Sequence, residues 1–171
     1  MSARHLILLV AAGAALAACE TVPVGAYGPG PGPRPTSTAF NPGDFAWSTQ
    51  PGRGSIDGRV NYRRDGQTFD CTGSVALTPD TPYTRARFRT LYGSTDRAAI
   101  PEAVVRARTV PDPNADYRSF VRSTTCQNGR FEFSGLPDGD WFIITPVSAG
   151  GDRIVLMRRI GTRGGRVSVT L

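Results

Sequence analysis

The segment from Cys126 to Val147, CQNGRFEFSGLPDGDWFIITPV, constrains the fold more than any other part of the sequence. Its Asn128-Gly129 pair is typical of a tight turn between two strands. After this turn, Phe131 and Phe133 alternate with polar residues, so both side chains are predicted to point to one face of a strand. The segment therefore indicates either a β-hairpin or an exposed aromatic platform for a ligand.

The second half of the segment favours the hairpin. Leu136-Pro137 is expected to close the end of the core, and Gly139 to permit a positive φ at the following turn. Trp141 then opens a continuous apolar run, which is typical of a strand in the centre of a sandwich. We therefore expect Trp141 in the core.

Short apolar alternations fill most of the chain after about Gly54. They occur in SIDGRVNY, TFDCTGSVALTP, DRIVLMRRI and GRVSVTL, and turn residues separate them. This pattern predicts an all-β fold, an antiparallel β-sandwich of about seven strands. Helix signals are confined to residues 81–93, with Thr81 as a cap, Pro82 in the first turn and Gly93 as the stop, although a loop or an edge strand also fits.

The first part of the chain, residues 1–18, has the form of a secretory signal peptide. Arg4 precedes an apolar run from Leu6 to Ala18, which is shorter than the roughly 20 residues of a stable membrane-spanning helix. The sequence LAAC at its end resembles the lipobox of bacterial lipoproteins, in which the cysteine thiol is acylated and the peptide is cut before it. The resemblance implies lipid attachment, with palmitate among the acyl chains, at Cys19. An ordinary signal peptide with a chance cysteine is the alternative.

Three regions follow from these signals: a signal peptide at 1–18, a lipidated N-terminus and Pro/Gly-rich tether at 19–45, and a sandwich domain at 46–171 with an insert at about 78–116. Two or more acyl chains anchor a protein stably in a bilayer. In enterobacterial lipoproteins an Asp after the lipidated cysteine signals retention in the inner membrane, so Glu20 favours the outer membrane. We expect a location in the bacterial cell envelope, facing the periplasm.

Cys71 and Cys126 are the remaining cysteines once Cys19 carries lipid. In the oxidising environment of an exported protein, an even pair most simply forms a disulfide. Two free thiols or a metal site are the alternatives, but two cysteines with no nearby histidine do not make a zinc site. We therefore expect a disulfide that joins neighbouring strands.

Candidates for catalysis are few. The single histidine is His5, inside the predicted signal peptide, which removes histidine-dependent nucleophilic catalysis and histidine metal sites from the rest of the chain. Paired carboxylates remain conceivable among five acidic residues: Asp70, Glu132, Asp138, Asp140 and Asp152. Two of them flank a turn glycine, where Asp commonly makes local hydrogen bonds. We predict that the protein is no enzyme and uses neither a cofactor nor a metal.

All twenty basic residues are arginine, and the net charge is +6. A lipid-anchored envelope protein meets no nucleic acid, so its acidic partners are the membrane, envelope proteins or anionic glycans. In YTRARFRTLYG, Arg85, Arg87 and Arg89 would share one face if the segment were extended. They form a candidate interaction surface, with a solvated loop face as the alternative.

Three motifs, GSIDGRV, GSVALTP and NGRFEFSGLPDGDWFIITPV, look like those of the carboxypeptidase regulatory-like domain and cover about residues 54–147. The matching residues are Gly58, Val60, Gly73, Val75, Leu77, Gly129, Phe131, Phe133, Leu136, Pro137 and Gly139, with Trp141 in place of the usual Tyr. The resemblance implies a transthyretin-type (prealbumin-like or Ig-like) sandwich that acts as a noncatalytic accessory. Enzymes on this fold, the hydroxyisourate hydrolases and intradiol dioxygenases, depend on histidines. The cysteine pair and the insert depart from the family pattern.

These observations lead us to expect a noncatalytic membrane-anchored envelope lipoprotein that presents its sandwich as an interaction or structural module. The alternative is a binding module for carbohydrate, envelope polysaccharide or another small ligand. In that case aromatic side chains would carry the binding, and the candidates are Trp47, Tyr83, Tyr92 and Trp141.

Overall fold

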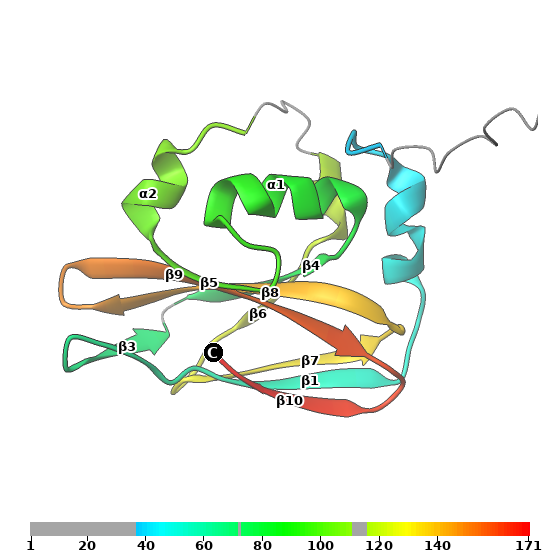
Figure 1. The fold of residues 1–171 in the computed structure, drawn as a ribbon. Helices are drawn as coiled ribbons and strands as arrows, with labels where there is room; N and C mark the ends of the chain where they lie inside the picture. Colours follow the sequence, from blue (N-terminus) through cyan, green and yellow to red (C-terminus); the bar gives the residue numbers. More distant parts are fainter. Residues whose placement is uncertain (1–36, 72, 111–115) are drawn as a thin grey trace, which may run out of the picture. The chain divides into compact units, whose positions relative to one another are not determined.

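The fold consists of two β-sheets, one of three strands and one of seven (Figure 1). The computed structural model describes residues 37–71, 73–110 and 116–171. The small sheet contains β1 (Gly54–Arg59), β7 (Arg130–Leu136) and β10 (Arg166–Thr170). The large sheet contains β2 (Tyr62–Arg64), β3 (Gln67–Cys71), β4 (Ser74–Pro79), β5 (Arg97–Pro101), β6 (Arg122–Thr125), β8 (Gly139–Ala149) and β9 (Asp152–Thr162). The helical elements are η1 (Pro42–Thr49), α1 (Pro82–Tyr92), α2 (Glu102–Ala107) and η2 (Asp116–Phe120).

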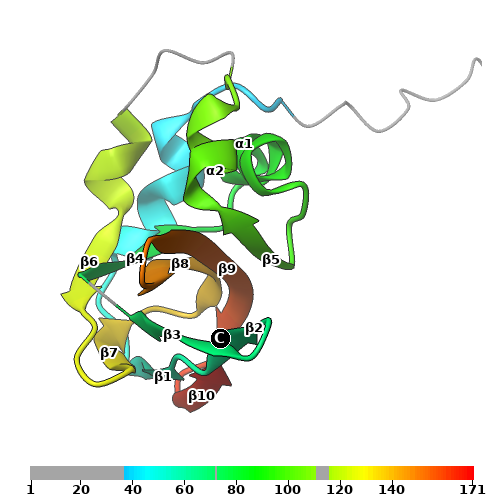
Figure 2. The same cartoon turned by 90° about the vertical axis from the view of Figure 1, so that its left-hand side faces the viewer.

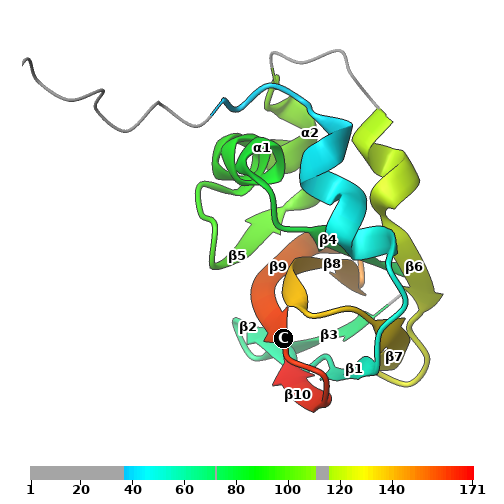
Figure 3. The same cartoon turned by 90° about the vertical axis from the view of Figure 1, so that its right-hand side faces the viewer.

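The small sheet lies against one face of the large sheet, and α1 and α2 lie over the other (Figures 2 and 3). β8 is the central strand of the large sheet, because it pairs with β9 along its whole length. Its other edge pairs with β4 and then with β3. The expected β-sandwich is thus confirmed, with ten strands in the described residues rather than about seven.

β8 is covered on both faces, which explains its continuous apolar sequence. Trp141 and Ile143 face the small sheet and belong to the core between the sheets. Phe142 belongs to a second core beneath α1, where its ring centroid lies 4.9 Å from that of Phe88. A strand buried on both faces carries an apolar run instead of an alternation. Each such side chain contributes about 1.5–3 kcal/mol when it is fully buried.

The small sheet follows the alternation that the sequence predicts. Ile56 of β1 and Phe131 and Phe133 of β7 point into the core and are at most 6% exposed. β1 pairs antiparallel with β7 but parallel with β10, so the sandwich is not wholly antiparallel. Gly58 lies opposite Phe131, and a Cβ atom on it would come within 1.9 Å of the Phe131 ring. The ring therefore requires glycine at this position.

The predicted turn at Asn128-Gly129 is confirmed, whereas the expected role of Gly139 is wrong. Asn128 and Gly129 have positive φ values, 51° and 70°. Gly139 has no positive φ; instead, a Cβ atom there would lie 2.0 Å from the ring of Trp47. Trp47 packs edge to face on Trp141 with 4.8 Å between ring centroids. Glycine is needed at residue 139 because this indole occupies the space of a side chain.

The insert at about 78–116 contributes α1, β5 and α2. Of the alternatives for residues 81–93, the helix is correct. The Thr81 hydroxyl accepts a hydrogen bond from the Thr84 N–H, and the Thr81 N–H donates to the Thr84 hydroxyl, which makes a capping box. Gly93 ends the helix in the left-handed region, at φ 72°.

η1 packs on the sandwich. Phe45 of η1 is fully buried, and its ring is stacked on that of Phe120 with 4.8 Å between the ring centroids. The predicted signal peptide, Cys19 and most of the predicted tether lie outside the described residues. In the part of the chain that is described, no helix is both long and apolar enough to span a membrane.

The expected disulfide between Cys71 and Cys126 is confirmed. Cys71 is the last residue of β3, Cys126 follows β6, and their Cα atoms lie 6.0 Å apart. The Cys126 N–H also donates to the Gly73 carbonyl at 3.0 Å. The bond therefore ties the end of β3 to the chain that leaves the large sheet for the small one.

Removing this disulfide is expected to lower the free energy of unfolding by about 4 kcal/mol, because the bond closes a long loop in the unfolded chain. The separation of the two cysteines is 55 residues. Urea titrations of the wild type and of the Cys71→Ser/Cys126→Ser variant, followed by tryptophan fluorescence, measure the difference. A reductant should destabilise the wild type and leave the variant unchanged. Equal stability of the two proteins would contradict the expectation.

Candidate binding surface on the small sheet

The three arginines of the expected basic stripe do not form one surface. Because the segment is the helix α1, Arg87 lies about 200° around the helix axis from Arg85. Arg85 forms two hydrogen bonds with the carboxylate of Asp80. Arg87 places its guanidinium 5.0 Å from the ring centroid of Tyr117. Arg89 is exposed. The stripe was conditional on an extended chain. The helix separates Arg87 from Arg85 and Arg89, which are four residues apart and lie on one helix face.

The four aromatic residues proposed as ligand contacts serve the core instead. Tyr83, Tyr92 and Trp141 are 3%, 7% and 0% exposed. Trp47 is half-buried and contacts Trp141. Three of the four rings are therefore buried, and Trp47 is partly covered by the core.

The five acidic residues considered for catalysis lie on separate elements. Asp70 is on β3, Glu132 on β7 and Asp138 in the turn that precedes β8. Two are held by arginine: Asp140 pairs with Arg159 and Arg163, and Asp152 pairs with Arg64. In the described ranges, no three His, Cys, Asp or Glu side chains gather in a way that could hold a metal ion.

Sequence reasoning missed an ionic cluster at the base of α1. Asp80 follows β4, and its side chain is fully buried. Its carboxylate accepts hydrogen bonds from Arg85 of α1 at 2.5 and 2.9 Å and from Arg159 of β9 at 2.5 Å. Arg159 also donates to Asp140 at 2.9 Å. The hydrogen bond with Asp80 raises the pKa of Arg85. The cluster fixes α1 to the β8–β9 hairpin, so its role is structural.

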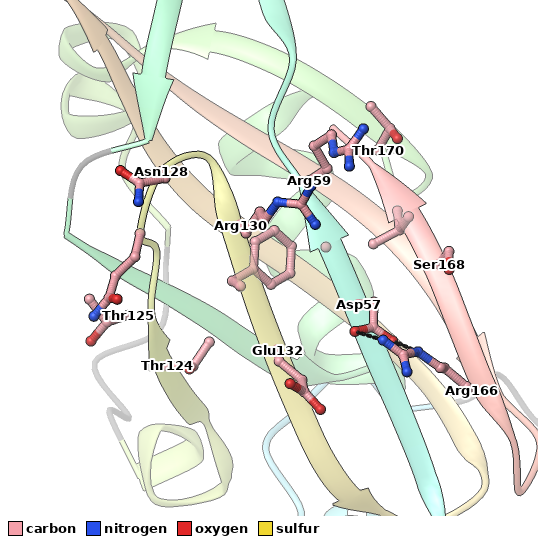
Figure 4. A pocket seen from close by; sticks show the side chains of 14 residues that line it. Asp57, Arg59, Thr124, Thr125, Asn128, Arg130, Glu132, Arg166, Ser168 and Thr170 are labelled. Carbon is pink, nitrogen blue, oxygen red and sulfur yellow. Dashed lines mark hydrogen bonds and ion pairs between the residues drawn. The ribbon is translucent and has the colours of Figure 1, made fainter.

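A large hollow lies at the small sheet and is lined mainly by polar residues (Figure 4). It has a volume of about 930 Å³ and is open to solvent. Its lining comes from β1, β7 and β10 and from the end of β6 with the turn that follows. The residues are Asp57, Gly58, Arg59, Thr124, Thr125, Gln127, Asn128, Arg130, Phe131, Glu132, Arg166, Ser168, Val169 and Thr170.

The strand register arranges the outward side chains of the small sheet in rows. Asp57 of β1 lies opposite Glu132 of β7 and Ser168 of β10, and we call Asp57 and Glu132 the acidic row. Two residues further along β1, Arg59 lies opposite Arg130 of β7, and we call these two residues the arginine pair. Like charges therefore face each other across β1 and β7 in both rows.

The acidic row has a partner on β10. The Arg166 guanidinium donates to Asp57 through Nη2 at 2.5 Å and also forms an ion pair with it through Nε (Figure 4). This hydrogen bond raises the pKa of Arg166, and the negative charge of Glu132 adds to the effect. Arg166 is thus already paired with a carboxylate of the acidic row.

One wall of the hollow exists because neighbouring strands enter different sheets. β6 belongs to the large sheet and β7 to the small sheet. They are linked by the turn at Asn128-Gly129 and by a single bridge between Gln127 and Arg130. Beyond this bridge the two strands diverge, and Thr124 and Thr125 line the hollow from β6.

This surface could be predicted only in part from the sequence. The alternation in SIDGRV and GRFEF assigns Asp57, Arg59, Arg130 and Glu132 to an outward face. Nothing local in the sequence indicates that β10 pairs parallel with β1, which brings Arg166 to Asp57.

Comparison with known proteins adds a likeness in fold. Neither protein-family models nor curated protein sequences match the chain. Among solved structures, the chain is similar to a crystal structure from Pseudomonas aeruginosa that is described as "a putative carbohydrate binding protein". The TM-score is 0.50 and the sequence identity 22%, over 77% of this chain and 97% of the other. At this identity the likeness concerns the fold alone.

Replacing Asp80 with Asn is expected to lower the free energy of unfolding by about 2 kcal/mol, because a buried carboxylate that binds two guanidinium groups is lost. Asp152→Asn is the matched control. Its ion pair with Arg64 is exposed, and such pairs contribute at most about 1 kcal/mol. Urea denaturation of both variants gives the two values, and equal losses would contradict a structural role for the Asp80 cluster.

Proposed function

We propose that the chain is a noncatalytic, membrane-anchored envelope lipoprotein whose sandwich binds polysaccharide through the outer face of the small sheet. The hollow on that face carries the proposal. Its rim combines carboxylates, guanidinium groups, hydroxyls and side-chain amides on the three strands of the small sheet, the end of β6 and one turn.

The chemistry of this face suits a ligand rich in hydroxyl groups. A sugar hydroxyl both donates and accepts hydrogen bonds, so a surface that recognises it needs acceptors and donors side by side. The acidic row supplies acceptors, Ser168 and Thr170 supply hydroxyls, and the arginines supply donors. Hydrogen bonds that involve a charged group are about twice as strong as neutral ones. An open hollow along strands also suits an elongated chain better than a small enclosed molecule.

Two further observations support a binding role over a catalytic one. The sequence after His5 contains no histidine, which leaves proton transfer near neutral pH to other groups. In the hollow, Asp57 is held by Arg166. The fold likeness is consistent with the proposal, since the similar protein is itself described as a putative carbohydrate binding protein.

The anchor is proposed from the sequence LAAC at residues 16–19, which resembles a lipobox. An anchor of two or more acyl chains would keep the sandwich at the membrane without any protein segment crossing the bilayer. The location that we propose is the outer membrane, on the periplasmic side.

Cys19→Ser is expected to abolish lipid attachment, because this thiol is the proposed acyl acceptor. In cells fed a labelled palmitate, the wild type should carry label and sediment with membranes, whereas the variant should carry none and leave the membrane fraction. The control is Cys71→Ser/Cys126→Ser, which removes two cysteines but keeps the proposed acceptor and should stay labelled. Unchanged membrane retention of Cys19→Ser would refute the anchor.

Polysaccharide binding is tested by narrowing the hollow at β10. Ser168 is exposed on β10 beside Asp57, and Ser168→Ile removes a hydroxyl and adds bulk on a strand that tolerates it. With the detergent-solubilised full chain and immobilised dextran or polygalacturonate, we expect at least a tenfold loss of affinity, about 1.4 kcal/mol. The matched control is Ser123→Ile, an exposed serine of β6 outside the hollow.

Two outcomes would count against this function. If the wild type binds neither polysaccharide, the sandwich is no polysaccharide module. Alternatively, both isoleucine variants could bind as the wild type does, which would place any binding site elsewhere. The melting temperature of each variant shows whether a loss of affinity comes from loss of the fold.

A further inference from the structure

We infer that the arginine pair, Arg59 and Arg130, binds the anionic group of an acidic polysaccharide, and we call this binding site the anion seat. The inference rests on the proposed function and deepens it, because it names the chemical class of the polysaccharide. The group would be a carboxylate or a phosphate ester, both of which match the planar fork of a guanidinium.

The strand register brings the two guanidinium groups together. Arg59 and Arg130 are directly opposite each other on β1 and β7, and both are exposed on the outer face. In Figure 4 the Arg130 side chain extends across β1 to lie beside Arg59. An anion above β1 could therefore receive hydrogen bonds from both side chains.

The described part of the chain gives neither arginine an ion-pair partner. Throughout residues 37–71, 73–110 and 116–171, no carboxylate forms an ion pair with Arg59 or Arg130. The acidic row lies two residues away along the same strands, but Asp57 of this row is already hydrogen-bonded to Arg166. The described residues therefore place two positive charges side by side without a partner of their own.

The repulsion between two adjacent guanidinium groups destabilises the folded protein and favours the binding of an anion. Like charges directly opposite each other on neighbouring strands are destabilising. A stabilising role in the free protein therefore does not account for the pair. A bound carboxylate or phosphate would reverse the sign of the interaction and would gain charge-assisted, bidentate hydrogen bonds from each guanidinium.

The surroundings of the pair suit the rest of a sugar chain. Thr170 lies opposite Arg59 on β10, and Asn128 lies in the turn just before Arg130. The acidic row is about 7 Å away, since each residue of a strand advances about 3.3 Å. The anionic group would lie on the arginine pair while neighbouring hydroxyls reach the acidic row and Ser168.

The experiment compares three polysaccharides on the detergent-solubilised full chain: polygalacturonate, which carries carboxylates, phosphomannan, which carries phosphates, and dextran, which is neutral. Arg59→Gln/Arg130→Gln should bind the acidic probe at least tenfold more weakly than the wild type and should lose far less affinity for dextran, because glutamine keeps an N–H donor for sugar hydroxyls but has no charge. The matched control is Arg89→Gln/Arg97→Gln, which removes the same charge from exposed sites outside the hollow and should change affinity less than twofold. Whichever acidic polymer binds more tightly identifies the anionic group.

A lysine variant separates the guanidinium fork from charge alone. Arg59→Lys/Arg130→Lys keeps both charges but loses the bidentate geometry, so its affinity for the acidic probe should fall between those of the wild type and the glutamine variant. The melting temperature of the glutamine variant should equal or exceed that of the wild type, because a repulsive pair is removed. A lower melting temperature would instead indicate a structural role.

The inference and the proposed function fail in distinguishable ways. If the wild type binds dextran as tightly as both acidic polymers, and the glutamine variant is indistinguishable from it, polysaccharide binding stands and the anion seat is refuted. If the control double variant loses as much affinity as the glutamine variant, net charge explains the binding and the seat is again refuted. If the wild type binds none of the three, both proposals fall.

Discussion

The pairing of β8 with β9 is the interaction on which the rest of the structure depends. Because β8 is hydrogen-bonded on both edges and covered on both faces, it anchors two separate cores. Trp141 fills the core toward the small sheet, and Phe142 fills the core toward α1. Close packing in both directions fully buries Trp141, Phe142 and Ile143, so the core of this strand leaves recognition to elements laid over it.

The small sheet is such an element, and its two faces come from one alternation. The alternation along β7 that buries Phe131 and Phe133 against β8 also points Arg130 and Glu132 outward. The core therefore determines the spacing of the charges on the surface, and the register with β1 and β10 determines which charges meet. A shift of one residue in that register would exchange the inner and outer sets, so the polar hollow exists only in the register that also fills the core.

Local signals in the sequence account for much of this fold, and contacts between distant segments account for the remainder. The alternation around Glu132 predicted a strand, and Thr81 with Gly93 predicted α1, because turn and cap chemistry acts over a few residues. The parallel pairing of β1 with β10 joins segments more than one hundred residues apart and has no local signature. For the same reason Gly139 was assigned a turn conformation, when its role is to admit the ring of Trp47.

The contact of η1 with the sandwich has a mechanical consequence. Chain that leaves the domain toward its N-terminus passes first through η1, where Phe45 is fully buried and Trp47 packs on Trp141. If Cys19 is anchored as proposed, tension between the membrane and a held polysaccharide reaches these aromatic contacts before it reaches β1. Under such tension η1 would then unfold before the small sheet, which holds the ligand.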